Sequence, residues 1–289
     1  MEFLRPATLA EALALKAERP DAVPIAGGTD VMVELNFDHR RPEALLDLTT
    51  VPELAEWSTS DGTIRLGAGV SYSRVIAELG ESVPALAMAS RTVGSPQIRN
   101  RGTVGGNLGA ASPAGDSHPP LLAVGAEVEV ASVRGTRRIA ASEFYTGVKR
   151  NALATDELIA AILLPRALGP QQFCKIGTRN AMVIAVATFA VALDPAGGRV
   201  GTGIGSAAPT PIRATDAESF LADALTADNL WQTRRELPAV LLREFGARVS
   251  AATAPIDDVR GTAAYRRHAM TVMAVRALGW AWDDYREVA

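Results

Sequence analysis

The sequence contains a single cysteine, Cys174, among 289 residues. One cysteine cannot form an intrachain disulfide, and it cannot by itself hold an iron–sulfur cluster ligated by cysteines. Histidine is scarce too, because only His39, His118 and His268 occur, which is a poor supply for a zinc site. We therefore expect no metal bound by this chain and a reduced, cytoplasmic setting.

The sequence also lacks an excess of basic charge and any long apolar run. Lys and Arg number 29 against 32 Asp and Glu, for a net charge of −3, so binding to nucleic acid is not expected. The longest apolar run, Ala181–Leu193, is too short to span a bilayer. The N-terminal segment has an early acid and no continuous apolar stretch, so we do not expect a signal peptide.

What is present is the composition of a globular protein with a substantial core, since 48% of the residues are hydrophobic and 21% are charged. The length leaves room for more than one domain. Thr8 and Glu11 form a capping-box pattern that predicts a helix running to Glu18. Apolar segments, glycine turns and helical patterns then alternate, which favours an α/β or α+β layout. The strands are expected at 22–26, 44–48 and 63–70, and the next helices at 72–79 and 84–91.

Residues 94–120 are rich in Gly, Pro and Asn, and we interpret them as one long functional loop. A hairpin is predicted around Arg134-Gly135, and residues 165–170 are the clearest linker. Gly201–Gly205 is interpreted as a bend at a strand edge, because it is not a dinucleotide fingerprint. The remaining elements are expected as strands at 173–178, 183–193 and near Val200, and as helices at 217–225, 238–252 and 263–282.

Two glycine loops are the candidates for chemistry. The first is Pro24–Asp30, in which Gly27 and Gly28 follow a strand and precede a helical turn. Paired glycines allow positive φ and close approach of a ligand, and successive N–H groups form an anion nest. For a single loop of this kind, a simple strand-to-helix turn that needs flexible glycine is the favoured explanation. The second loop, Gly102–Asn107, repeats the pattern with a hydroxyl and an amide. Two such loops together predict a cradle for the diphosphate of a dinucleotide.

Asp116 follows the second loop and is suited to accept hydrogen bonds from ribose or ribityl hydroxyls, although a turn-forming aspartate is the alternative. Other motifs are missing. No glycine loop carries a Walker A lysine, and the sequence has neither a G-x-S-x-G elbow nor an H-E-x-x-H pair. We therefore expect no catalytic acid–base or nucleophilic residue in this chain.

The two loops, written A-G-G-T-D at Ala26–Asp30 and R-N-x-G-T-V-G-G-N at Arg99–Asn107, resemble the FAD-binding medium subunits of molybdenum hydroxylases. That group includes the flavin domain of xanthine dehydrogenase and the medium subunit of carbon monoxide dehydrogenase. The resemblance covers nearly the whole chain. It extends to S-P-x-x-D at Ser112–Asp116, to Lys175–Arg179 and to the helical C-terminal segment from Asp257.

The resemblance implies an α+β chain with a vanillyl-alcohol-oxidase-type FAD-binding fold. Two α/β subdomains, of about 1–55 and 56–168, would form the FAD-binding domain, and 169–289 a C-terminal domain of antiparallel sheet and helices. The two loops would hold the diphosphate, Asp116 sugar hydroxyls, and Ile159 and Lys175 would lie near the flavin. The positions that match the family's cofactor-binding residues are Ile25, Ala26, Gly27, Gly28, Thr29, Asp30, Val93, Thr103, Val104, Gly105, Gly106, Asn107, Asp116, Ile159 and Lys175.

The resemblance implies an electron-transfer subunit with non-covalent FAD, since the first loop lacks the histidine to which some enzymes of this fold attach the flavin. A large subunit would carry the molybdenum cofactor and a small one two [2Fe-2S] clusters, in a dimer of heterotrimers. Electrons would pass to NAD or another acceptor. Two alternatives stay open: a self-sufficient flavin oxidase or dehydrogenase using Tyr145 or His118 as base, and a binding module without cofactor.

Overall fold

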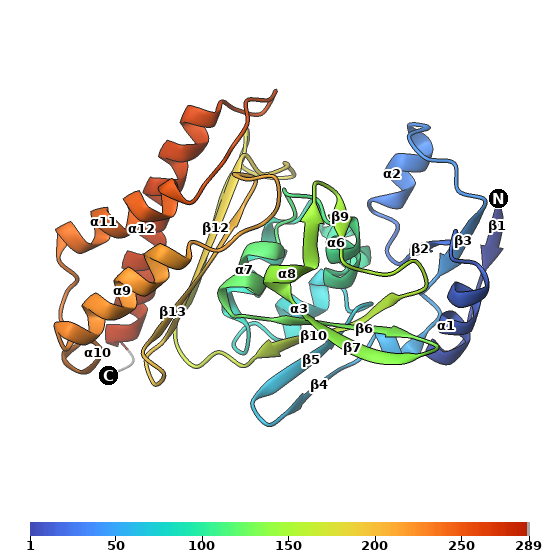
Figure 1. Cartoon of the computed structure of the whole chain (residues 1–289), viewed down its shortest axis with the longest axis horizontal. Helices are drawn as coiled ribbons and strands as arrows, with labels where there is room; N and C mark the ends of the chain where they lie inside the picture. The colour runs from blue at the N-terminus through green and yellow to red at the C-terminus, as the bar shows by residue number, and fades with distance from the viewer. Residues whose placement is uncertain (288–289) are drawn as a thin grey trace.

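The computed structural model describes residues 1–287. Along its longest axis the chain arranges a small sheet, a larger central sheet and a third sheet backed by long helices, in the order of the sequence (Figure 1). Both helices and strands contribute throughout, so the α+β class predicted from the sequence is confirmed. Within residues 1–287, no helix combines the length and apolar character needed to cross a membrane.

The first sheet is parallel, and α1 (Leu9–Glu18) joins two of its strands. Its strand order is β1 (Glu2–Leu4), β3 (Ala44–Asp47), β2 (Val23–Ile25). The predicted cap of α1 is confirmed, because Thr8 Oγ1 accepts a hydrogen bond from Glu11 N at 3.2 Å. The Glu11 carboxylate reaches back to the N–H of Ala7 rather than that of Thr8. The exposed helix α2 (Val31–Asn36) follows β2.

The central sheet is antiparallel, in the order β4 (Trp57–Ser60), β5 (Thr63–Gly67), β10 (Leu158–Pro165), β6 (Glu127–Ser132), β7 (Gly135–Ala140). The middle strand β10 is buried at every position except Pro165, as expected for a strand covered on both faces. The elements around it are η1 (Pro52–Leu54), α3 (Tyr72–Glu78), α4 (Pro84–Thr92), α8 (Ala141–Phe144) and the hairpin of β8 (Tyr145–Gly147) with β9 (Arg150–Asn151).

The prediction of one long loop over residues 94–120 was wrong. The segment holds three short helices, α5 (Pro96–Arg101), α6 (Val104–Ala110) and α7 (His118–Ala123). Side-chain caps offset the poor helix propensity of its glycines, since Ser95 Oγ accepts from Ile98 N and Thr103 Oγ1 accepts from Gly106 N. Packing then selects the helices, because Gly105 lies against Ala68 where a larger residue has no room.

The third sheet, antiparallel in the order β11 (Gln171–Ile176), β12 (Ala187–Asp194), β13 (Arg199–Gly205), has helices on both faces. On one face lie α9 (Thr215–Ala227), α11 (Ala239–Ala251) and α12 (Ala263–Glu287), with the short α10 (Leu230–Thr233) at one end (Figure 1). On the other face α4 and α7 contact it, and so connect it to the central part of the chain.

The interpretation of Gly201–Gly205 as a bend was wrong, because these residues are regular strand in β13. The reason for the glycines is the helix packed over them. A Cβ added at Gly201 would lie 1.9 Å from the carbonyl oxygen of Ala123, and one at Gly203 would lie 1.9 Å from that of Pro119. The glycines therefore allow the backbone of α7 to rest directly on β13.

A buried histidine–tyrosine pair lies in the central core. His118 Nδ1 is 2.8 Å from the hydroxyl of Tyr145, and both side chains are enclosed. His118 begins α7 and is fully buried. Burial lowers the pKa of His118 to about 3 and raises the pKa of Tyr145, so both are neutral near pH 7.

Replacing Gly201 with Ala is expected to destabilise the chain by about 1–3 kcal/mol, because the added methyl collides with a backbone carbonyl that cannot rotate away. Urea unfolding followed by circular dichroism measures the change. Gly279→Ala in α12 is the matched control, since a Cβ there meets nothing within 4 Å and should stabilise by roughly 0.5–1 kcal/mol. Equal effects at both positions would contradict the packing of α7 on β13.

The neutral state of His118 predicts a specific loss of stability in acid. On unfolding, the pKa returns to its ordinary value of 6.5, so below that pH the unfolded chain binds a proton that the folded chain does not. Stability should therefore fall by about 1.4 kcal/mol per pH unit from pH 6.5 towards 3 on account of this group. Unfolding free energies of wild type and His118→Asn, measured across this range, should converge as the pH falls, whereas parallel curves would refute a buried neutral histidine.

Candidate functional site

The first glycine loop connects β2 to α2, and its backbone touches the second loop. A Cβ built on Gly27 would lie 1.8 Å from the carbonyl oxygen of Arg101, the last residue of α5. No residue other than glycine fits there without moving one of the two backbones. The next residue, Gly28, has φ of +75°, a left-handed conformation that also favours glycine. The two loops predicted to act together are therefore in direct contact.

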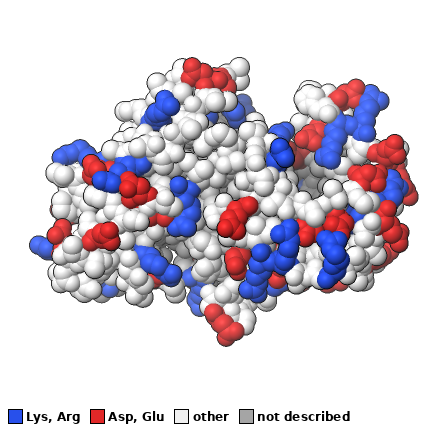
Figure 2. All heavy atoms as spheres, in the orientation of Figure 1, with Lys and Arg blue, Asp and Glu red and all other residues white. Residues whose placement is uncertain are grey.

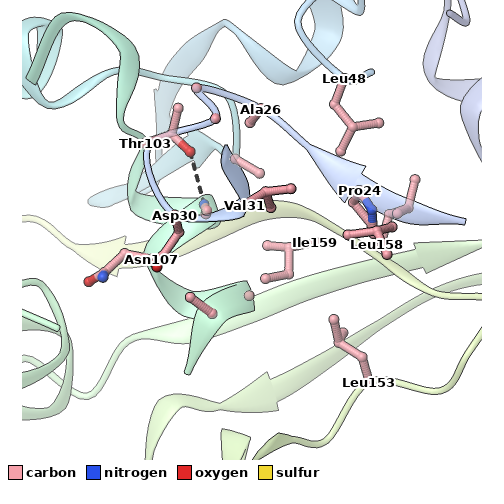
Figure 3. Close-up of a pocket in the computed structure, with 18 of the residues that line it drawn as sticks. Pro24, Ala26, Asp30, Val31, Leu48, Thr103, Asn107, Leu153, Leu158 and Ile159 are labelled. Atoms are coloured by element: carbon pink, nitrogen blue, oxygen red, sulfur yellow. Dashed lines mark hydrogen bonds between the residues drawn. The ribbon is translucent and has the colours of Figure 1, made fainter. Parts of the chain in front are cut away.

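The second loop begins α6. Thr103 is its N-cap, and its Oγ1 accepts the N–H of Gly106 at 2.9 Å (Figure 3). The cap uses the N–H of Gly106, while the N–H groups of Val104 and Gly105 in the same first turn have no partner within the helix. A Cβ on Gly105 would lie 2.5 Å from Ala68, which fixes the turn on the central sheet, whereas one on Gly106 would meet only Thr103 Oγ1, at 3.0 Å. The free side of Gly106 therefore faces open space.

Between the two loops lies a cavity of about 620 Å³. Figure 3 shows Thr103, Asp30 and Asn107 at one end of it, and Pro24, Leu48 and Leu158 at the other. On the outside, the molecule is hollowed beneath α2, with charges of both signs around the rim (Figure 2). The volume is within the usual range for small-molecule sites of about 300–1,000 Å³.

Most of the residues predicted as binding positions lie in this cavity. Those lining it are Ala26, Gly27, Gly28, Thr29, Asp30, Val93, Thr103, Gly105, Gly106, Asn107 and Ile159. Ile25 ends β2 and Val104 is buried in the core, and neither lines the cavity. Burial raises the pKa of Asp30, while the nearby charge of Lys149 opposes that rise.

A second cavity, of about 420 Å³, adjoins the first. Val93, Ile98 and Asn107 line both, so the two spaces are neighbours along α5 and α6. Residues 182–184, which precede β12 in the C-terminal part of the chain, also line the second cavity. Asp116 lines this second cavity rather than the first. An elongated ligand could thus extend from one cavity into the other.

Asp116 and Lys175 form an ion pair that the sequence did not predict. Lys175 Nζ lies 2.5 Å from Asp116 Oδ2, and the two side chains are 9% and 8% exposed. Lys175 Nζ also donates to the carbonyl of Thr92 at 3.1 Å, and the Thr92 hydroxyl donates to Asp116 Oδ2 at 3.2 Å. Burial raises the pKa of Asp116, and the ammonium of Lys175 acts against that rise. Lys175 lines neither cavity directly.

One carboxylate oxygen of Asp116 makes no hydrogen bond within residues 1–287. This atom, Oδ1, is buried. A buried oxygen without a donor costs free energy, so native sites usually provide one. A hydroxyl group of a bound ligand would satisfy it, and the sugar-binding role of Asp116 stays a prediction.

His118 and Tyr145, the two candidate bases of the alternative oxidase hypothesis, line neither cavity. Among the described residues 1–287, no group of three or more His, Cys, Asp or Glu side chains could hold a metal ion. Sequence reasoning also missed several charged residues of the first cavity. These are Lys16, Asp21, Glu34, Arg40, Lys149 and Glu157. They are far apart in the sequence and belong to no motif, so only the fold reveals that they lie together.

Two family profiles match consecutive parts of the chain. Residues 1–167 match the FAD binding domain in molybdopterin dehydrogenase, and residues 172–281 match the CO dehydrogenase flavoprotein C-terminal domain. The chain is 31% identical over 286 residues to the xanthine dehydrogenase FAD-binding subunit of Escherichia coli O157:H7, which covers 96% of this chain and 94% of that protein. It is 37% identical over 207 residues to the nicotinate dehydrogenase FAD-subunit of Eubacterium barkeri, covering 68% and 70%.

Solved structures give the same result. Carbon monoxide dehydrogenase from Hydrogenophaga pseudoflava contains a chain that superposes with a TM-score of 0.89 at 27% identity, covering 98% of both chains. Quinoline 2-oxidoreductase from Pseudomonas putida 86 contains one with a TM-score of 0.89 at 25% identity, covering 99% of this chain and 98% of that one. The chain therefore belongs to the family of FAD-binding medium subunits of molybdenum hydroxylases, which are oxidoreductases of the xanthine and carbon monoxide dehydrogenase type.

Proposed function

We propose that this chain is an electron-transfer subunit that accepts electrons from an iron–sulfur partner through non-covalently bound FAD and passes them to NAD or another acceptor. The observation that carries the proposal is the contact between the two glycine loops, which together line one cavity. FAD, when bound, supplies a centre that takes up two electrons and releases them again.

The residues of this chain bind and orient the cofactor in this proposal. Backbone N–H groups at Gly27–Thr29 and in the first turn of α6 hold the diphosphate. Asp116 accepts a hydrogen bond from a ligand hydroxyl at its free Oδ1, while the Lys175 ammonium opposes the rise in the pKa of that carboxyl that burial causes. Ile159 and Val93 provide apolar contacts, and Ile25 and Val104 support the loops from behind.

Three observations in the cavities fit FAD. Gly27 and Gly105 line the first cavity and pack too closely on Arg101 and Ala68 to carry a side chain, so at these positions they present only backbone. The unpartnered Asp116 Oδ1 lacks the donor that a ribityl or ribose hydroxyl provides. The two adjoining cavities suit a long ligand whose halves differ in polarity. The first loop offers no histidine, which supports dissociable rather than covalent FAD.

The proposed partners are a large subunit with the molybdenum cofactor and a small subunit with [2Fe-2S] clusters, as a dimer of heterotrimers in the cytoplasm. Relatives named as medium chains of carbon monoxide and glyceraldehyde dehydrogenases support a multisubunit assembly. We also propose that 1–168 is the FAD-binding domain, with subdomains of about 1–55 and 56–168, and 169–289 the C-terminal domain. Two large buried clusters support this division, one drawn from residues 12–164 and one from 187–282.

Replacing Gly28 with Ala is expected to weaken FAD binding at least tenfold, because the methyl group strains the left-handed turn that shapes the diphosphate side of the cavity. Gly62→Ala is the matched control, since Gly62 has nearly the same φ, +73°, and lies in the β4–β5 turn with open space around it. Quenching of flavin fluorescence on titration gives both affinities. Equal affinities for the two variants would show that the first loop does not hold FAD.

A bulky residue at Gly106 tests the second loop separately. Gly106→Leu should remove FAD, because its side chain extends into the open side of the first turn of α6, while the C-terminal sheet and helices remain folded. Flavin absorbance of the purified variant and its near-ultraviolet circular dichroism measure the two effects. Retention of FAD at wild-type affinity would overturn the assignment of this loop.

The partner dependence of electron transfer gives another test. FAD reconstituted into the isolated chain should stay oxidised when organic substrates of relatives are added, because the two candidate bases, His118 and Tyr145, line neither cavity. Adding the large and small subunits with substrate should bleach the flavin absorbance. Rapid bleaching by substrate without those subunits would instead favour the self-sufficient oxidase.

A further inference from the structure

One of the cationic side chains that line the first cavity is that of Lys149. Lys149 lies in the turn between β8 and β9, and its side chain, 62% exposed, lines the same cavity as both glycine loops. Its Nζ is 3.5 Å from Oε1 of Glu34, a residue of α2 that lines the cavity too. The contact joins two surface elements that meet at the mouth of the cavity.

The position of Lys149 is fixed by its hairpin. Asn151 Nδ2 donates to the carbonyl of Gly109 at 3.0 Å, which attaches the hairpin to the end of α6. Lys149 itself has φ of +53°, a left-handed conformation that favours Gly or Asn. Lysine is therefore an unfavourable residue for the backbone conformation of this turn. Such exceptions are often associated with a function of the side chain.

The charges around the cavity indicate what the Lys149 side chain does. Its acidic residues are Asp21, Asp30, Glu34 and Glu157, and a dinucleotide diphosphate would add further negative charge. Among the other cationic residues of the cavity, Lys16 already uses its ammonium group, because Nζ donates to the carbonyls of Pro20 at 2.8 Å and Ala22 at 2.7 Å. Arg40 Nη1 lies 3.9 Å from Oε2 of Glu34, which is part of α2. Lys149, in contrast, is close enough to Asp30 for its charge to act on that carboxyl beside the glycine loop.

We propose that Lys149 is a diphosphate-binding residue of this chain, which exchanges its contact with Glu34 for the phosphates of FAD when the cofactor enters. The inference rests on the proposed function. In this arrangement Glu34 competes with the diphosphate for one ammonium group. A flexible lysine suits that exchange, because its ammonium is a compact charge on a long stem with three donors.

The test compares variants of the full chain by titration with FAD, with ADP as a diphosphate probe and with adenosine as a probe without phosphates. Lys149→Asn removes the charge and suits the left-handed turn, so it should keep or raise the Tm. It should weaken FAD and ADP binding about tenfold and leave adenosine unchanged. Lys149→Arg keeps the charge and should stay within about threefold of wild type.

Two further variants isolate the exchange. Arg150→Asn removes the same charge from the next residue, which is exposed and does not line the cavity, and should change FAD affinity by less than about twofold. Glu34→Gln frees Lys149 and should tighten FAD binding severalfold, and this gain should shrink in the Lys149→Asn background. Raising the salt concentration should reduce the difference between wild type and Lys149→Asn.

The outcomes separate this inference from the proposed function. Wild-type chain that binds neither FAD nor ADP would refute the proposed function. Wild-type chain that binds FAD, with Lys149→Asn binding equally well, would refute the role of Lys149 alone. Equal losses in Lys149→Asn and Lys149→Arg, or a loss of adenosine binding as large as that of ADP, would also overturn it, because the side chain would then act through shape rather than charge.

Discussion

The contact between Gly27 and the carbonyl of Arg101 is the constraint on which the site depends. It places the end of a parallel strand from the first sheet directly against the end of α5, so the loop after β2 and the first turn of α6 face each other. Gly105 fixes the same turn on the central sheet through Ala68. At these glycine positions the wall of the cavity is backbone that close packing holds in place, so its shape is set before any ligand arrives. Such preorganisation reduces the entropic cost of binding.

A second constraint connects this site to the C-terminal part of the chain. The buried pair of Asp116 and Lys175 joins the segment before α7 to β11, and the glycines of β13 let α7 rest on the same sheet. Burying two charges costs free energy that their attraction offsets only with good geometry and further hydrogen bonds. Thr92 supplies two of those bonds. The wall of the second cavity therefore depends on both halves of the chain, since Asp116 lines it and Lys175 lies in β11.

The sequence predicted the local features well and the tertiary ones poorly. The cap at Thr8 and the turns of the two glycine loops depend on neighbours in sequence, so the sequence pattern was sufficient to locate them. The resemblance to known medium subunits supplied the family. The helices α5 to α7 were missed because their Gly and Pro content is unfavourable by propensity, which packing overrides where α6 lies against Ala68 and α7 against β13. The pairing of Asp116 with Lys175 joins positions 59 apart, and the contact of Lys149 with Glu34 joins two exposed surface elements. No spacing rule connects such residues, since only the closed fold brings them together.

A crystal structure of this chain grown with FAD tests the central claim most directly. The account predicts the diphosphate in contact with backbone N–H groups of both glycine loops at once, with the rest of the cofactor extending past Asn107 towards Asp116. A diphosphate bound to only one loop, with Gly27 and Arg101 separated, would contradict it, because the contact between the loops would then not be what forms the site.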